Sequence, residues 1–167
     1  MELKDEFSGS RKLLRLFWSI VFLFVIYLIA GMRIPVNATH YDVSGTLSIP
    51  SINLVSDVTT LKKENHSLKT PDTIVGSYSN AENKTLLIGH SSTVFYNLNK
   101  VSVGDIFKYN ELYFVVTNSE VLAKKDISMD DILKAEDENT IIIMTCAGED
   151  LGGGDATHRL ILTAKAL

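Results

Sequence analysis

The single cysteine of this chain, Cys146, stands where a run of β-forming residues gives way to a glycine-rich stretch. The segment reads IIIMTCAGEDLGGGDATHRLIL, residues 141–162, and a second apolar run begins at Arg159. A lone thiol is either a small buried hydrophobic group or a nucleophile, and functional side chains are frequent where a strand passes into a loop. We therefore treat Cys146 as a candidate nucleophile, with packing as the alternative.

Arg159 can supply positive charge beside that thiol. If residues 141–146 and 159–164 pair as a hairpin, Arg159 comes back level with Cys146. A thiol attacks as the thiolate, which a neighbouring cation stabilises, and a guanidinium can bind a carbonyl oxygen as it becomes an oxyanion. Arginine does not give up its proton, so proton transfer requires a further group, for which histidine is the usual choice.

Four histidines are available for that role. His40 lies in a stretch expected to be a tether and His66 in a charged loop, where both are expected to face solvent. His158 adjoins Arg159, and neighbouring residues of a strand point to opposite faces. His90 ends the run TLLIGH, the same strand-to-loop position that Cys146 has. His90 is therefore the candidate acid and base, with a structural role as the alternative.

The composition is that of a folded protein with one core. The chain has 167 residues, of which 46% are hydrophobic and 22% charged. Its formal net charge of −4 provides no basic field for a polyphosphate, so nucleic acid is not expected as a partner. One cysteine forms no disulfide within the chain and no zinc-type pair. Acidic groups at 130–131 and 136–138 match no EF-hand spacing, so we predict no metal site and no cofactor.

An apolar segment near the N-terminus is the candidate membrane anchor. Residues 13–32 carry only one charge, and the uncharged stretch from 16 to 32 is long enough to cross a bilayer. Basic residues before it keep residues 1–12 in the cytoplasm and send the rest outside. A cleaved signal peptide is the alternative, but the apolar run is longer than usual for one and no A-x-A site follows it. We predict a single-pass protein of the cell membrane, with a tether over 33–45 and an extracellular domain over 46–167.

The exported part is predicted to be β structure almost throughout. Strand signals occur in TLSIPSINLVSDV, KTLLIG, DIFKYNELYFVVTNSEVL, TIIIMTC and RLILTAKAL, with a turn at residues 109–111. Several short strands of this kind indicate a sandwich or a barrel. One helix is expected in SMDDILKAEDE, where Ser128 and Asp131 have capping-box spacing. LKKENHSLKTPD is expected to be a loop or a short amphipathic turn.

Three segments together resemble the sortase family. IGHSSTVFYNLNKVSVGDIF is similar to its histidine segment, IMTC followed by HRLILTA to its cysteine and arginine strands, and LSIPSINL to its opening strands. The resemblance covers about residues 46–167 in the family's order. The family's T-L-x-T-C pattern stands here as IIMTC, which keeps the Thr-Cys pair and lacks the first threonine. The subclass and the preferred sorting signal therefore stay open.

The resemblance implies an all-β fold, a closed eight-stranded barrel with one or two short helices, and a cysteine transpeptidase. Cys146 would attack the threonine carbonyl of an LPXTG-like sorting motif near the C-terminus of a secreted protein. His90 would serve as general acid and base, and Arg159 would hold the substrate backbone and the oxyanion. An amine from a peptidoglycan precursor or from a pilin would then resolve the acyl-enzyme.

The resemblance also suggests where the sorting peptide binds. The segment before the cysteine strand, about residues 123–139, would form one wall of its groove. Candidate lining residues there are Ile127, Ile132 and Leu133, with core packing of a short helix as the alternative. Thr145 and Ser91 are further candidate contacts beside the nucleophile and the histidine.

Two other interpretations of function remain. In the first, the same acyl-enzyme is released to water, so the protein is a cysteine peptidase-like hydrolase. In the second, the barrel binds peptide or cell-wall material without catalysis, and Cys146 only packs.

Overall fold

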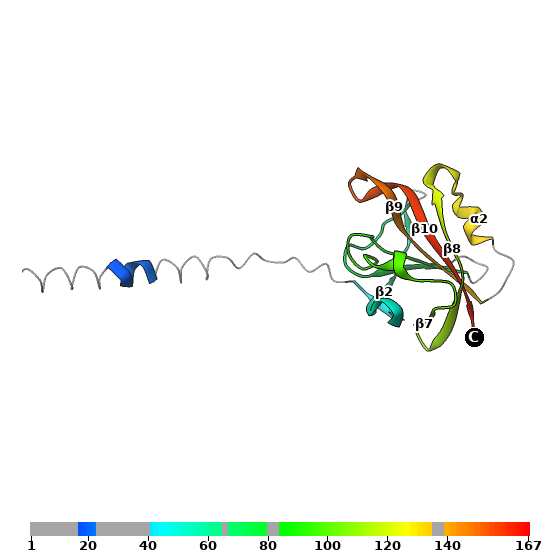
Figure 1. Ribbon diagram of the computed structural model, residues 1–167, viewed down its shortest axis with the longest axis horizontal. Helices are drawn as coiled ribbons and strands as arrows, with labels where there is room; N and C mark the ends of the chain where they lie inside the picture. The colour runs from blue at the N-terminus through cyan, green and yellow to red at the C-terminus, as the bar shows by residue number, and fades with distance from the viewer. Residues whose placement is uncertain (1–16, 23–40, 65–66, 80–83, 135–138) are drawn as a thin grey trace, which may run out of the picture. The chain divides into compact units, whose positions relative to one another are not determined.

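The computed structural model of the chain describes residues 17–22, 41–64, 67–79, 84–134 and 139–167 (Figure 1). The chain divides into two units, Met1–His40 and Tyr41–Leu167. In the first unit, residues 17–22 are helical. Within the described ranges, no helix combines the length and the hydropathy that crossing a membrane requires. The predicted cytoplasmic tail, most of the predicted anchor and the tether up to residue 40 lie outside these ranges.

Eight strands of the second unit form a closed barrel, as the family resemblance implied. Their order around the barrel is β1-β2-β5-β6-β9-β10-β8-β7, and β7 pairs with β1 to close it. Neighbouring strands are antiparallel except for two parallel pairs, β2 with β5 and β6 with β9. The strands are β1 (Val43–Ile49), β2 (Leu54–Thr60), β5 (Val75–Ser79), β6 (Thr85–Ile88), β7 (Ile106–Tyr109), β8 (Leu112–Ala123), β9 (Thr140–Gly152) and β10 (Asp155–Ala166).

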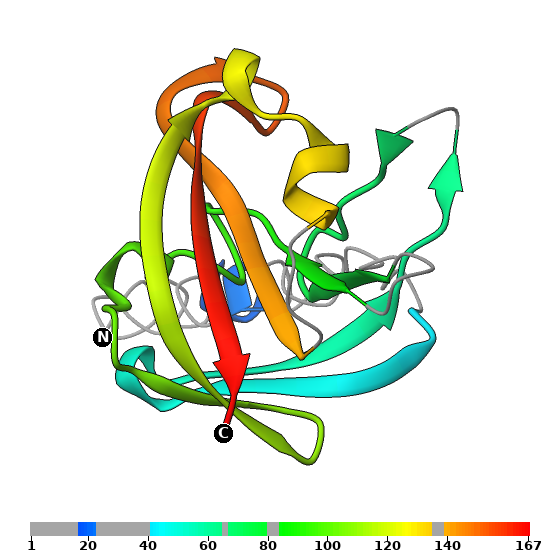
Figure 2. The ribbon, with the colours of Figure 1, turned by 90° about the vertical axis from the view of Figure 1, so that its right-hand side faces the viewer.

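Short helical elements join the strands. The predicted helix is confirmed as α2 (Met129–Leu133), and the side chain of Ser128 accepts a hydrogen bond from the Asp131 backbone N at 3.3 Å. The predicted turn between β7 and β8 is also confirmed, with Asn110 in the left-handed region at φ 53°. The 3₁₀ turns are η1 (Pro50–Ile52), η2 (Leu98–Lys100) and η3 (Lys124–Asp126). Figure 2 shows η3, α2 and the β9–β10 turn at one end of the barrel, with the C-terminus at the other.

Three details of the sequence prediction need correction. The stretch expected to be a loop or amphipathic turn contains two short strands, β3 (Lys63–Glu64) and β4 (Ser67–Leu68), which form a separate sheet. Strand β5 was not predicted, because its sequence VGSYS lacks an apolar run. Strand β1 begins at Val43, inside the stretch expected to be tether.

Both faces of β6 and β9 are buried, which explains their continuous apolar sequences. Successive side chains of a strand point to opposite faces, so Leu87 and Ile143 belong to the core cluster inside the barrel. Leu86 and Ile142, on the other face, belong to a second cluster that α2 covers through Leu133. Parallel strands are usually covered on both faces in this way.

We predict that stability depends on the inner cluster of the barrel. Leu162 of β10 is 0% exposed, whereas Leu112 at the start of β8 is 62% exposed. Leu162→Ala should lower the free energy of unfolding by about 3–5 kcal/mol, because it removes buried methyl groups and leaves a cavity. The matched change Leu112→Ala should alter it by less than about 0.5 kcal/mol. Urea unfolding of both variants measures the difference, and equal losses would contradict the assignment of the core.

Candidate active site

The parallel register of β6 and β9 brings His90 and Cys146 to the same edge of the sheet. Ile88 is the Cα partner of Met144, where the paired part of β6 ends. His90 follows Ile88 by two residues, and Cys146 follows Met144 by two residues. The two residues therefore lie at the same level beyond this pair. Both side chains are half-buried. The structure thus brings together two residues that are far apart in sequence.

Arg159 reaches the same place through the antiparallel pairing of β9 and β10. It is the Cα partner of Cys146, which confirms the predicted hairpin. Ile161, two residues further along β10, belongs to the outer cluster under α2, whereas Leu160 belongs to the inner one. Because faces alternate along a strand, Arg159 shares the outer face and His158 does not. The His158 ring instead lies 2.8 Å from the hydroxyl of Thr157.

A pocket of about 630 Å³ collects these residues on the outer face of the barrel. His90, Cys146 and Arg159 all line it. Its apolar lining comes from the cluster under α2 and its basic lining from three lysines. The remaining lining residues are Lys63, Leu68, Thr70, Tyr78, Ile88, Gly89, Lys124, Ile127, Met129, Asp130, Leu133, Lys134, Met144, Thr145 and Gly154. We call this the first hollow.

Thr145 connects the cysteine strand to the histidine segment. Its hydroxyl donates a hydrogen bond of 2.8 Å to the backbone carbonyl of Gly89, and its side chain is buried. Each partner of this bond directly precedes one of the candidate residues, Cys146 or His90. A buried hydroxyl that lost this acceptor would be left unsatisfied, which costs about 1–3 kcal/mol. The bond therefore fixes the level of His90 against Cys146.

The β9–β10 turn lies against both candidate residues through Gly154. The Cys146 thiol donates to the Gly154 carbonyl with Sγ and O 3.4 Å apart. A Cβ placed on Gly154 would lie 3.3 Å from Cε1 of His90. Gly154 has φ +80°, and Gly152 and Gly153 before it also have positive φ, which side chains other than glycine rarely adopt. The three glycines thus allow the turn to approach the site closely.

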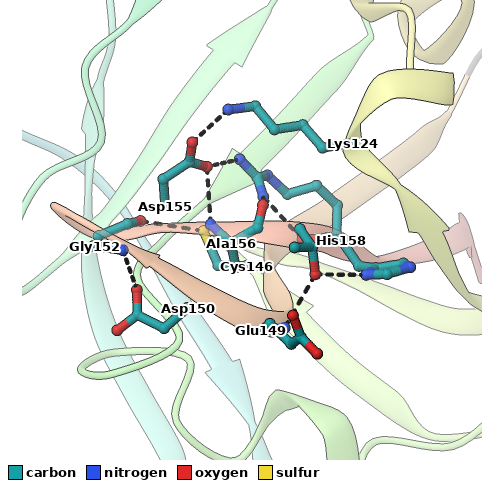
Figure 3. A network of polar contacts seen from close by, with 11 residues as sticks. Lys124, Cys146, Glu149, Asp150, Gly152, Asp155, Ala156 and His158 are labelled. Atoms are coloured by element: carbon teal, nitrogen blue, oxygen red, sulfur yellow. Dashed lines mark hydrogen bonds and ion pairs between the residues drawn. The ribbon is translucent and has the colours of Figure 1, made fainter.

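Arg159 is held by residues of its own hairpin, among them Asp155 and Ala156, which Figure 3 labels together with Lys124. Its Nη1 donates to the carbonyls of Ala156 and His158, both at 2.8 Å, and its Nη2 donates to Asp155 Oδ1 at 2.6 Å. Asp155 also forms an ion pair with Lys124 of η3. Hydrogen bonds from Lys124, then from Arg159 and from the backbone N of Ala156, hold the pKa of Asp155 well below its usual range. The carboxylate therefore stays charged and keeps the guanidinium in one orientation.

Of the five residues predicted to contact the substrate, four line a pocket and one does not. Ile127 and Leu133 line the first hollow. Ile132 packs in the cluster under α2 and lines neither this hollow nor a second one that also includes Cys146. Ser91 lines a second hollow, and Thr145 lines both.

Among the described residues, no group of three His, Cys, Asp or Glu side chains is arranged to hold a metal ion. The acidic residues 136–138 lie outside the described ranges.

No sequence pattern indicated the roles of Gly154, Asp155 and Lys124. On a straight strand Asp155 would lie about 13 Å from Arg159, at about 3.3 Å per residue. The β9–β10 register shifts at Asp155/Ala156 and at Ala156/His158, so the hairpin is irregular where Asp155 and Arg159 form their ion pair. No local pattern predicts such bulges, so neither the clamp on Arg159 nor its link to Lys124 could be found from the residues alone.

A family model for the sortase domain matches residues 47–167. This chain belongs to the sortase family. The match includes β2–β10 and the last three residues of β1, and therefore the whole of the site described above. No curated protein matches the chain in sequence.

Solved sortase structures share the fold of this sortase domain. Sortase C1 from Streptococcus suis is 20% identical, with a TM-score of 0.60 over 77% of this chain and 74% of that one. Sortase C1 of Streptococcus agalactiae is 22% identical, with a TM-score of 0.58 over 75% of this chain and 67% of that one. A lid mutant of sortase A from Corynebacterium diphtheriae is 19% identical, with a TM-score of 0.58 over 84% and 78%. Structures of both kinds, A and C, are thus similar to this domain.

We predict that a methyl group on Gly154 displaces the His90 ring. Gly154→Ala should shift the ring by a few tenths of an ångström, because the new Cβ meets it at 3.3 Å. Gly153→Ala is the matched control, since Gly153 has φ +64° but open space around its Cβ position. Both variants should lose about 1–2 kcal/mol of stability from backbone strain. Only Gly154→Ala should move the His90 ring resonances in NMR, and equal shifts in the control would contradict this contact.

We predict that Asp155 makes the stability of the fold depend on acid pH. Its pKa is lower in the folded chain than the ordinary value of 3.8, so its contribution is complete above that value. The contribution is lost as pH falls below about 4 toward the folded pKa. Asp155→Asn should therefore show a smaller fall in Tm than the parent chain between pH 5 and pH 2. Lys124→Met, which removes the largest cause of the shift, should show part of this effect. Parallel Tm curves for all three proteins would argue against the clamp.

Proposed function

We propose that this sortase domain is a cysteine transpeptidase that cleaves an LPXTG-like sorting motif and transfers the acyl part to an amine. The observation that carries the proposal is that a half-exposed thiol, an imidazole and a guanidinium line one hollow, from β9, from the segment after β6 and from β10. Cys146 lies within β9, which continues to Gly152, and not at the strand end that the sequence predicted. Those groups supply a nucleophile, a proton carrier and an oxyanion ligand. The family supports the substrate class.

Acylation uses Cys146 and His90 together. The thiol gives its proton to the imidazole, its contact with the Gly154 carbonyl breaks, and sulfur attacks the threonine carbonyl carbon. A C–S bond forms, and the carbonyl electron pair moves onto oxygen. When the tetrahedral intermediate collapses, the C–N bond breaks and the imidazolium protonates the leaving amine. The product is a thioester on Cys146.

Arg159 is suited to bind the oxyanion. Three of its five N–H groups are engaged by the hairpin, which leaves one on Nη2 and the one on Nε without a partner in the described part of the chain. Its side chain is only 15% exposed, so the remaining donors act where water is scarce. Because the hairpin already fixes the guanidinium, little reorganisation accompanies the development of charge.

The acceptor amine belongs to either a peptidoglycan precursor or a pilin in this proposal. Two of the similar structures are described as sortases C1 and C2 of pilus island 1 of group B Streptococcus. At 22% and 19% identity these likenesses concern the fold, so they do not favour one acceptor over the other. Release of the thioester to water, the hydrolase alternative, differs only in the second nucleophile.

The proposal includes a place for the enzyme. We infer a single-pass protein of the cell membrane, in which the apolar residues 13–32 anchor the chain and the sortase domain acts outside the cell. Substrates that are themselves secreted, and acceptors that are built at the cell surface, would then be within reach of the tethered domain.

The proposal predicts products that depend on Cys146. The purified full chain is incubated with a library of sorting-type peptides, with triglycine or hydroxylamine present, and mass spectrometry identifies the products. We expect peptides cut within the motif and joined to the amine, and we expect none from Cys146→Ala. His90→Ala should slow product formation by about 100-fold or more, as is usual when a general acid and base is lost.

Two different outcomes would contradict the proposal. Cut peptides with a free carboxylate, at every amine concentration, would identify a hydrolase. Peptide binding without any cut product would identify a non-catalytic barrel.

A further inference from the structure

A second hollow opens beside Cys146, toward the inner face of the barrel. Its volume is about 420 Å³. Leu160 and Val121, which are Cα partners across β10 and β8, form part of it, and Thr145 and Cys146 separate it from the first hollow. Its other lining residues are Ser91, Phe95, Tyr96, Asn99, Ser119, Ala147 and Gly148. The nucleophile therefore lies between two hollows on two faces of the sheet.

The two hollows differ in charge. The first is lined by Lys63, Lys124, Lys134 and Arg159 against the single carboxylate of Asp130. Asp131 and Asp155, which pair with three of these cations, reduce the excess without removing it. Among the described residues that line the second hollow, none is charged.

Unpartnered polar groups surround the second hollow. The side chains of Ser91, Tyr96, Asn99 and Ser119 supply hydroxyl and amide groups to it. None of the four makes a side-chain hydrogen bond within the ranges that the structure describes. Each oxygen can accept from an N–H donor, which is what an amine or a peptide N-terminus offers. Ser91 directly follows His90, so the hollow begins next to the candidate base.

Acyl transfer needs a place for a second substrate that the donor does not fill. The first hollow is the larger and has the apolar lining and the candidate oxyanion ligand that the donor peptide requires. A primary amine is mostly ammonium at neutral pH, and the cations of the first hollow repel it. The second hollow has no charged lining residue in the described part of the chain and does not repel an ammonium. Cys146 lines it as well.

We propose that the second hollow binds the primary amine that resolves the acyl-enzyme, an assignment that rests on the proposed function. The ammonium loses one proton to solvent water, and the neutral nitrogen attacks the thioester carbon while His90 accepts its second proton. A C–N bond forms and the C–S bond breaks, with its electron pair returning to sulfur as thiolate. The imidazolium then reprotonates the thiolate, which restores the free enzyme.

The test compares two amines on the purified full chain. Triglycine is a cationic, peptide-like acceptor, and hydroxylamine is small and largely uncharged, so it needs no binding site. We measure kcat/KM for each, at a fixed concentration of a sorting-type donor peptide that the wild type cleaves. The ratio of the triglycine value to the hydroxylamine value reports acceptor binding, because acylation by the donor is common to both amines.

Charge placed in the second hollow should change that ratio in opposite directions. Ser119→Lys should lower it about fivefold and Ser119→Glu should raise it about as much, as expected for one charge near a partly exposed ammonium. Tyr96→Ala should also lower it. Ser102→Lys and Tyr113→Ala are matched controls on exposed residues that line neither hollow, and they should leave the ratio unchanged.

Three results would overturn the assignment. Ratios that stay within twofold in all the Ser119 and Tyr96 variants would show that the acceptor binds elsewhere. Equal losses with triglycine and hydroxylamine would make the second hollow part of the donor site. Absence of any Cys146-dependent product in the wild type, with either amine, would refute the proposed function itself and this assignment with it.

Discussion

The parallel register of β6 against β9 is the constraint on which the rest of the site depends. A slip of one residue would turn either His90 or Cys146 to the other face of the sheet. The buried hydrogen bond from Thr145 to the Gly89 carbonyl opposes such a slip, because breaking it leaves a polar group unsatisfied. Thr145 therefore has a structural task beside any contact with substrate. This geometry gives a physical reason for a threonine directly before Cys146.

Burial on both faces links the stability of the barrel to the shape of the first hollow. The residues of β6 and β9 that point outward pack under α2, and this cluster continues into the lining of the hollow through Ile88 and Met144. The same outward positions, two residues further along, carry His90 and Cys146. Core packing and site geometry thus share one alternation pattern.

Local features of this site were predictable and non-local ones were not. The apolar runs of β6, β9 and β10, the Ser128 cap and the hairpin register of Cys146 with Arg159 all follow from neighbouring residues. Strand β5 and the β3–β4 sheet escaped prediction because their residues are polar or small, and their pairing depends on distant partners. The parallel neighbours β6 and β9 are likewise separated by more than 50 residues, and composition does not identify such partners.

The bulged end of the β9–β10 hairpin holds the Cys146 thiol weakly and the Arg159 guanidinium firmly. Gly154 offers one weak acceptor to the Cys146 thiol, a contact that the proposed attack must break. Asp155 and two backbone carbonyls hold the Arg159 guanidinium through stronger, charge-assisted bonds that attack leaves in place. The conformational entropy of the Arg159 side chain is therefore lost during folding and not during the reaction, whereas the Cys146 side chain stays free to move. An electrostatic site works best when the stabilising group is fixed and the reacting atom is the part that moves.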